Sequence, residues 1–276
     1  MRLRPFGPTQ TPVPVVGQGT WTMERDRRRS VEALRRGLDL GMTHIDTAEM
    51  YGSGAVEEVV GDAIQGRRDE VFLVSKVLPS NATSRGTVAA CERSLRRLRT
   101  DRLDVYLLHS PSRHPLAETL EGFRRLVAAG KIRAFGVSNF DEELLDEAVA
   151  LAGPGAIACN QVLYHLGDRW IEHGLIDRCA AAGVAVVGYS PFGQGDFPDR
   201  DPVLAAIAAA RGATPRQVAL AFLLRHRGTF TIPKSSSIAH VEENAGVGDL
   251  ELDAEETARI DATFPVRVAR GGLGRL

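Results

Sequence analysis

The sequence predicts an α/β fold, most simply a (β/α)8 TIM barrel, on three observations. Short aliphatic or β-branched segments alternate with longer helical patterns through all 276 residues. Eight such short segments occur, separated by helical segments, which is the order of parallel βαβ units. The composition, 43% hydrophobic and 25% charged, is that of a globular protein, and the length suits a barrel. No linker or repeat divides the chain, so we expect residues 1–276 to form one domain.

The expected strands are short apolar runs bounded by Gly, Pro or polar residues. They span residues 13–16, 43–45, 71–75, 103–108, 132–137, 156–159, 184–188 and 229–232. The expected helices lie between these strands, over residues 29–40, 56–64, 85–98, 116–129, 142–151, 172–182 and 214–225. A further helix follows the three serines after Lys234.

A doubly wound sheet is the alternative fold. Its dinucleotide fingerprint needs a third glycine and a helix directly after the glycines. Gly17-Gln18-Gly19 lacks that third glycine and leads into Thr20-Trp21 instead. This absence favours the barrel.

Charge and cysteine content narrow the class of partner. The net charge is −1 with no long run of one sign, so neither nucleic acid nor an anionic membrane surface is expected as a partner. No apolar segment resembles a signal peptide or a membrane span, which predicts a cytoplasmic protein. Cys91, Cys159 and Cys179 are far apart and odd in number, which favours reduced thiols over a disulfide framework or a zinc site. We expect a small-molecule ligand and no metal.

Ionisable residues follow three consecutive strands. Asp46 ends one strand, with Tyr51 in the loop behind it; Lys76 and His109 end the next two strands. Each residue alone has a structural explanation, such as a cap, loop packing or a core histidine. Together they indicate a site, because the carboxyl ends of barrel strands meet at one mouth. Lysine is also rare here, at three of 34 basic residues, which singles out Lys76.

These four side chains suit protonation of an oxygen atom. A phenol titrates near pH ~10 in water, and a neighbouring ammonium lowers that value. A carboxylate would hold the ammonium charged, and a histidine beside the phenol would orient a carbonyl oxygen. Carbonyl reduction also needs a hydride, which side chains cannot supply, so a nicotinamide or flavin is implied.

Candidate cofactor residues also follow strand ends. Ser138-Asn139 and Asn160-Gln161 offer amides for a carboxamide. Lys234 with the serines before a helix offers a phosphate site, although a serine N-cap beside a surface lysine is equally consistent with the pattern.

Taken together, these stretches resemble the aldo-keto reductase superfamily over nearly the whole chain. The matching motifs are VGQGTW, IDTAEMYG, FLVSK, LDVYLLH, GKIRAFGVSNF, NQVLYH, YSPFGQG and IPKSSSIAHVEEN. Within the superfamily the sequence looks closest to short bacterial members that include methylglyoxal reductases. The resemblance implies a barrel that binds NADP(H) at its C-terminal mouth and reduces small carbonyl compounds as a monomer. It also implies the catalytic tetrad Asp46, Tyr51, Lys76 and His109.

The same resemblance implies the cofactor contacts, in three groups. Around the nicotinamide would lie Gly19, Thr20, Trp21, Ser138, Asn139, Gln161 and Tyr189, with Tyr189 stacked on the ring. Ser190 and the loop to Gly195 would hold the pyrophosphate. The adenosine 2′-phosphate would meet Lys234 and Ser235, and the adenine would meet Glu243 and Asn244.

Three positions depart from the family pattern. His240 stands where many members have an arginine that stacks on adenine and pairs with the 2′-phosphate, which weakens the expected preference for NADPH. Ser110 and Leu78 replace frequent aromatic residues, which predicts a more open substrate pocket. The segment after the last helix, 264–276, is short, so small aldehydes or dicarbonyls are expected rather than steroids.

Three other functions are alternatives to the predicted carbonyl reduction. A regulatory barrel would bind the cofactor without significant turnover. A metal-dependent hydrolase would use Asp46 and His109 as ligands, but His44 and Asp46 form only a weak metal motif. A module that only binds a ligand would keep its function when the Tyr51 hydroxyl is removed.

Overall fold

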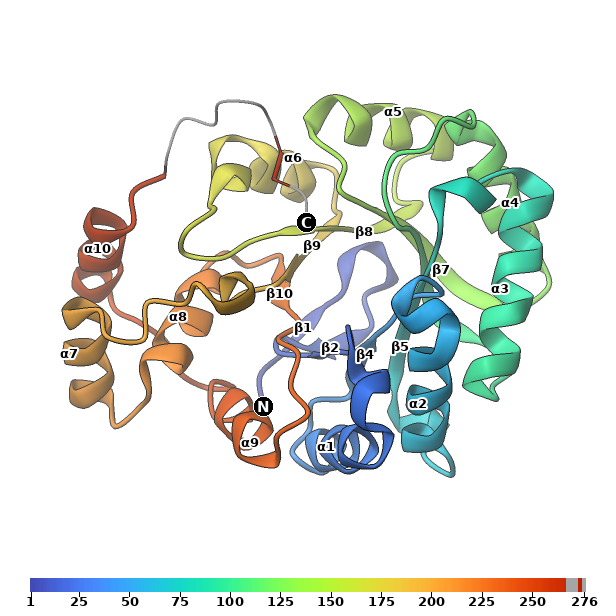
Figure 1. Cartoon of the computed structure of the whole chain (residues 1–276). Coiled ribbons are helices and arrows are strands. Elements are labelled where there is room, and N and C mark those ends of the chain that lie inside the picture. Colours follow the sequence, from blue (N-terminus) through green and yellow to red (C-terminus); the bar gives the residue numbers. More distant parts are fainter. Residues whose placement is uncertain (267–272, 275–276) are drawn as a thin grey trace.

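A ring of eight parallel strands forms the centre of the fold (Figure 1). The computed structural model describes residues 1–266 and 273–274. The strands follow one another round the ring in chain order, and backbone hydrogen bonds from Thr231 N to Val15 O (2.9 Å) and from Gly17 N to Thr231 O (2.8 Å) close it. The predicted fold class is therefore confirmed. The ring strands are β3 (Gln18–Gly19), β4 (His44–Asp46), β5 (Phe72–Val77), β6 (Leu103–Leu108), β7 (Ile132–Ser138), β8 (Ile157–Leu163), β9 (Ala185–Tyr189) and β10 (Thr229–Thr231).

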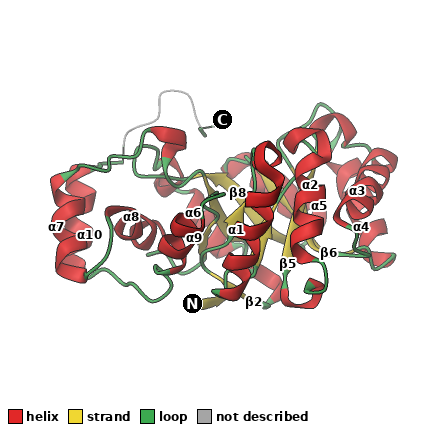
Figure 2. Cartoon of the chain, turned by 60° about the horizontal axis from the view of Figure 1, so that its bottom comes forward, coloured by secondary structure: helices red, strands yellow, loops and turns green. Residues whose placement is uncertain are grey.

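Helices surround the strands, which are yellow in Figure 2. Several begin at a side-chain cap; in α1, for example, Asp26 accepts a hydrogen bond from the backbone N–H of Arg29. None of the helices in the described part of the chain combines the length and apolarity needed to cross a membrane. The helices are α1 (Arg27–Asp39), α2 (Ala55–Ile64), α3 (Ser84–Leu98), α4 (Leu116–Ala128), α5 (Glu142–Ala152), α6 (Leu175–Ala181), α7 (Pro202–Arg211), α8 (Pro215–Leu223), α9 (Ile238–Ala245) and α10 (Ala254–Thr263).

The prediction of a first barrel strand at residues 13–16 is wrong in its first half, whereas Val16 does pair in parallel with Thr231 of β10. Pro12–Pro14 form β2, which pairs antiparallel with β1 (Leu3–Pro5), and β3 begins at Gln18, directly after the residues that bond to β10. Proline lacks an N–H group, so a proline at each end of β2 suits an edge hairpin better than a strand bonded on both sides. Phe6 and Val13 of this hairpin pack into the barrel interior against Phe72, the first residue of β5, and so cover the N-terminal end of the barrel.

The interior of the barrel changes from apolar to polar along the strands. Successive residues of a strand point to opposite faces, so every second residue faces inward. On β5, Phe72 and Val74 lie in the apolar interior cluster, and the next inward position is Lys76. On β6, Val105 and Leu107 lie in that cluster, and the next position is His109. The polar layer therefore lies at the C-terminal end, above a packed apolar floor.

Candidate active site

The four predicted strand-end residues come together at the C-terminal mouth. Asp46 is the last residue of β4, Lys76 lies in β5 and His109 directly follows β6. Tyr51 begins a 3-10 turn, Tyr51–Gly54, in the connection from β4 to α2. Asp46 is 1% exposed and Lys76 is fully buried, so both charges are removed from water.

Lys76 links the other members of the group. Its Nζ lies 2.5 Å from Asp46 Oδ1, donates to Thr47 O at 2.8 Å and reaches Tyr51 Oη at 3.5 Å. The second carboxylate oxygen of Asp46 accepts a hydrogen bond from Gln161 Nε2 at 2.7 Å. A buried charge is costly unless it is paired and hydrogen-bonded, and here both charges of the pair have several partners.

These contacts set the protonation states. Burial disfavours the ammonium of Lys76, but Asp46 and Tyr51 outweigh it and raise the pKa of Lys76 above its ordinary value. Burial raises the pKa of Tyr51, and Lys76 opposes that rise without cancelling it. Tyr51 is therefore a protonated phenol at neutral pH, directed at a charged ammonium.

His109 is neutral beside the phenol. Its ring lies edge-on to the Tyr51 ring, with centroids 5.7 Å apart and an interplanar angle of 77°. Burial, with a smaller contribution from Lys76, lowers the pKa of His109 to about 3. Its Nδ1 has no hydrogen-bond partner within the described residues. A neutral imidazole suits a hydrogen bond to a carbonyl oxygen.

The loop that carries Tyr51 is fixed by Glu49, a residue that the sequence did not single out. Glu49 is 7% exposed, and its Oε1 accepts hydrogen bonds from Leu78 N at 2.8 Å and Asn81 Nδ2 at 2.9 Å. After Tyr51 the backbone turns through left-handed conformations at Gly52 (φ 54°) and Ser53 (φ 53°). Residues that adopt this conformation without being glycine concentrate at functional sites.

Comparison with known proteins decides the family. Residues 15–264 match the model of the aldo/keto reductase family. The chain belongs to this family. The reductase is 46% identical over 268 residues to methylglyoxal reductase YeaE of Escherichia coli, covering 95% of this chain and 94% of that protein. It is 36% identical to the glyoxal reductase of Bacillus subtilis, covering 91% and 88% of the two chains. An aldo-keto reductase from Klebsiella pneumoniae, solved in complex with NADPH, superimposes with a TM-score of 0.94 at 45% identity, covering 100% and 99% of the two chains.

The amide and hydroxyl residues expected around a nicotinamide are joined by hydrogen bonds in the reductase. Ser138 Oγ donates to Gln161 O at 2.8 Å, Asn139 Nδ2 donates to His109 O at 3.1 Å, and Tyr189 Oη donates to Asn139 Oδ1 at 2.9 Å. Asn139 (φ 62°) and Ser190 (φ 50°) have left-handed backbone, each directly after a strand. Amide and hydroxyl groups held in this way fit a carboxamide, which both donates and accepts hydrogen bonds.

Residues after β3 line the same mouth. Thr20 Oγ1 donates to Asp46 O at 2.8 Å and so ties this connection to the end of β4. A Cβ atom on Gly19 would lie 2.6 Å from Ile232 O, so closure of the barrel itself requires glycine there. The Trp21 side chain is 48% exposed, as a residue that meets a ligand can be.

The predicted pyrophosphate residues lie in the loop after β9, and the predicted 2′-phosphate and adenine residues lie after β10 and in α9. Gly195 has a φ of 118°, a conformation that favours glycine, in the loop after β9. Lys234 and His240 are exposed, whereas Asn244 is 3% exposed and offers little surface to a ligand. Ser235 Oγ accepts a hydrogen bond from Ser237 N at 3.0 Å. A cation beside hydroxyls and backbone N–H groups fits a phosphate.

The described side chains do not form a group of metal ligands. Among residues 1–266 and 273–274, no three His, Cys, Asp or Glu side chains are grouped as a metal site would require. Asp46 is instead saturated by Lys76 and Gln161. The three cysteines are buried and unpaired, and burial raises the pKa of Cys91 to about 12, so its thiol is unreactive.

Proposed function

We propose that this reductase converts small aldehydes, ketones or dicarbonyls to alcohols with NADPH, using Tyr51 as the proton donor. One observation carries the proposal: the buried ammonium of Lys76 contacts both Asp46 and the Tyr51 hydroxyl, with His109 beside them. Membership of a reductase family and similarity to a protein solved with NADPH support the choice of reaction and cofactor.

The side chains act in a definite order. His109, neutral because of its low pKa, donates a hydrogen bond to the substrate oxygen and holds it near Tyr51. A bound nicotinamide supplies the hydride to the carbonyl carbon. As negative charge develops on the oxygen, Tyr51 transfers its proton, and Lys76 stabilises the phenolate that remains. Asp46 and Gln161 keep Lys76 charged and in position.

We propose that Ser138, Asn139 and Gln161 bind the nicotinamide carboxamide and that Tyr189 packs on its ring. The hydrogen bonds among these residues hold their side chains in place before the cofactor binds, which reduces the entropic cost of binding it. Ser190 and Gly195 would hold the pyrophosphate, and Lys234 with Ser235 would hold the 2′-phosphate. Glu243 and Asn244 would lie near the adenine.

The proposed substrates are small dicarbonyls such as methylglyoxal. The similar proteins named methylglyoxal and glyoxal reductase support this class. Ser110 and Leu78 make the mouth less aromatic than in many relatives. Most of the C-terminal segment that suggested small substrates, residues 267–272 and 275–276, lies outside the described residues. A higher kcat/KM for a steroid ketone than for methylglyoxal would overturn this part of the proposal.

The direct test is oxidation of NADPH and, separately, NADH by the purified protein with methylglyoxal and with an aromatic aldehyde. Turnover with NADPH preferred is the expected result. Tight NADPH binding without turnover would instead support a regulatory barrel. We also propose a single-domain monomer that acts in the cytoplasm without a nucleic-acid or membrane partner, and analytical ultracentrifugation tests the monomer.

A further inference from the structure

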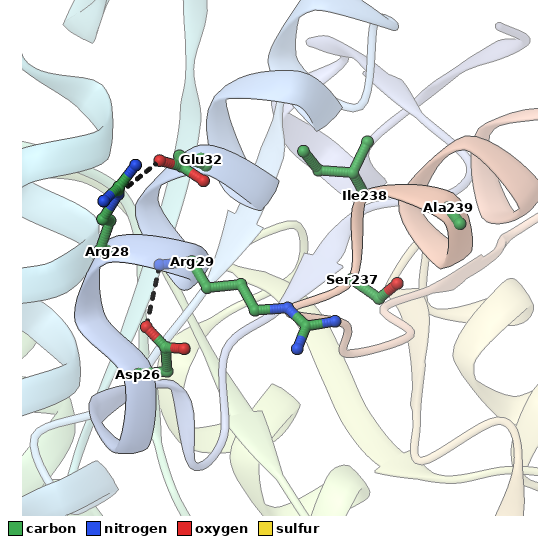
Figure 3. Close-up of a pocket in the computed structure, with 7 residues that line it drawn as sticks. All are labelled: Asp26, Arg28, Arg29, Glu32, Ser237, Ile238 and Ala239. Atoms are coloured by element: carbon green, nitrogen blue, oxygen red, sulfur yellow. Dashed lines mark hydrogen bonds and ion pairs between the residues drawn. The ribbon is translucent and has the colours of Figure 1, made fainter.

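A depression of about 530 Å³ lies between the first turns of α1 and α9, two helices far apart in the sequence (Figure 3). Figure 3 shows the Arg29 side chain extended from α1 toward Ser237, the residue before α9. Arg28 and Glu32 point to a different side of α1. The lining residues are Asp26, Arg28, Arg29, Glu32, Ser237, Ile238 and Ala239.

Both acids of the depression have partners on α1. Asp26 Oδ1 caps α1 by accepting a hydrogen bond from the backbone N–H of Arg29 at 3.1 Å. Glu32 pairs with Arg28 at 3.0 Å. Within the described part of the chain, the guanidinium of Arg29 makes no hydrogen bond or ion pair. Its five donors remain available to a ligand.

Arg29 and Arg25 lie within electrostatic range of a third cation, Lys234. Partial burial lowers the pKa of Lys234, although its side chain is exposed, and the nearby cations Arg25 and Arg29 lower it further, with Glu24 opposing them. Like charges held together disfavour their own charged forms, and a bound anion relieves this repulsion. The mutual repulsion of these cations therefore favours a bound anion such as a phosphate.

The two sides of the depression are held in register. Ser30 Oγ lies 3.1 Å from Ser236 Oγ and donates to Met23 O at 2.9 Å, which joins the first turn of α1 to the serine loop. Further along the two helices, Arg36 Nε donates to Glu242 Oε1 at 2.8 Å. These contacts keep Arg29 facing the loop that begins at Lys234.

We propose that Arg29 binds the 2′-phosphate of NADPH together with Lys234, and so supplies from α1 the guanidinium that is missing at His240. A guanidinium can donate two parallel hydrogen bonds to a phosphate, which an exposed imidazole cannot do. The 2′-phosphate is the group that distinguishes NADPH from NADH, so Arg29 determines cofactor specificity. This inference rests on the proposed use of NADPH.

The test compares dissociation constants for NADP⁺ and NAD⁺, measured by calorimetry without substrate. In Arg29→Gln, the affinity for NADP⁺ should fall roughly tenfold, the usual effect of losing a charged hydrogen bond, while that for NAD⁺ should change less than about twofold. Arg28→Gln is the matched control, because Arg28 is the adjacent arginine but pairs with Glu32, and both affinities should stay within about twofold. Arg29→Lys should give an intermediate affinity for NADP⁺.

The outcomes separate the two proposals. If the wild-type protein binds NADP⁺ more tightly than NAD⁺ and Arg29→Gln does not alter that ratio, the role of Arg29 is overturned and the proposed function stands. If the wild-type protein does not prefer NADP⁺, the proposed cofactor is wrong, and the role of Arg29 falls with it. Because the Arg29 guanidinium is exposed and makes no contact that the fold needs, the variant should fold normally, which its melting temperature checks.

Discussion

Gln161 Nε2 donates to Asp46 Oδ2 at 2.7 Å, on the opposite oxygen of the carboxylate from Lys76. The contact joins β8 to β4 across the barrel interior. Asp46 therefore has a neutral donor on one oxygen and a cation on the other, in a place that water does not reach. Removal of the cation would leave a buried carboxylate with only a neutral donor and backbone around it.

Replacement of Lys76 by methionine should reduce both activity and stability. The unpaired Asp46 should cost about 3–5 kcal/mol in the free energy of unfolding. Loss of the ammonium beside Tyr51 should lower kcat by roughly 10²–10⁴-fold, the usual contribution of assisted proton transfer. Urea unfolding and steady-state kinetics measure the two effects.

The double variant Asp46→Asn/Lys76→Met is the control for this prediction. It removes both charges, so it should recover much of the lost stability while activity stays low. Equal stability in the single and double variants would show that the stability lost in Lys76→Met does not come from an unpaired Asp46 carboxylate.

Replacement of Tyr51 by phenylalanine should lower kcat by roughly 10²–10⁴-fold with little change in NADPH affinity. The ring packing against His109 is kept, and the lost hydroxyl makes only a 3.5 Å contact with Lys76, so the melting temperature should barely change. Kinetics, calorimetric NADPH binding and thermal unfolding test these points together. Undiminished turnover would remove Tyr51 as the proton donor.

The convergence of Asp46, Tyr51, Lys76 and His109 could be predicted because parallel barrel strands bring their carboxyl ends to one mouth, so strand-end residues meet whatever their sequence separation. The contact between Gln161 and Asp46 could not, because it depends on which residues face each other across the closed ring. Arg29 was hidden for a similar reason, since its nearness to Lys234 arises from the packing of α1 against α9.

The position of the first barrel strand also could not be predicted from the local sequence pattern. Residues 13–16 have the β-branched composition of a strand, but packing and the prolines place part of them in the hairpin beneath the barrel. The true first strand, Gln18–Gly19, is too short and too polar to stand out. Its place is set by hydrogen bonds to its neighbours in the ring.

The pH dependence of kcat/KM should show no inflection near the ordinary histidine pKa. The pKa of His109 is lowered to about 3, so this ring stays neutral throughout the usual assay range. The pKa of Tyr51 is raised by burial, so its phenol loses the proton only above roughly pH 10. A kinetic pKa near 6.5 that disappears in His109→Asn would contradict a neutral His109.

His44 should make the protein sensitive to acid. It is fully buried with neither ring nitrogen hydrogen-bonded among the described residues, and its ring lies edge-on to Phe72, with centroids 5.5 Å apart. Burial lowers the pKa of His44 to about 4 against opposing attraction from Asp46. Because the folded pKa lies below the unfolded value, the stabilisation is complete above pH ~6.5 and is lost as the pH falls toward 4.

At pH 5 this loss should be about 2 kcal/mol, on the order expected for such a shift, and His109 should add to it over the same range. His44→Leu should therefore lose less unfolding free energy than the wild-type protein between pH 7.5 and pH 5, measured by urea unfolding. His240→Asn, which alters an exposed histidine, should keep the wild-type dependence. If His44→Leu loses as much unfolding free energy as the wild-type protein, protonation of His44 does not cause the loss of stability in acid.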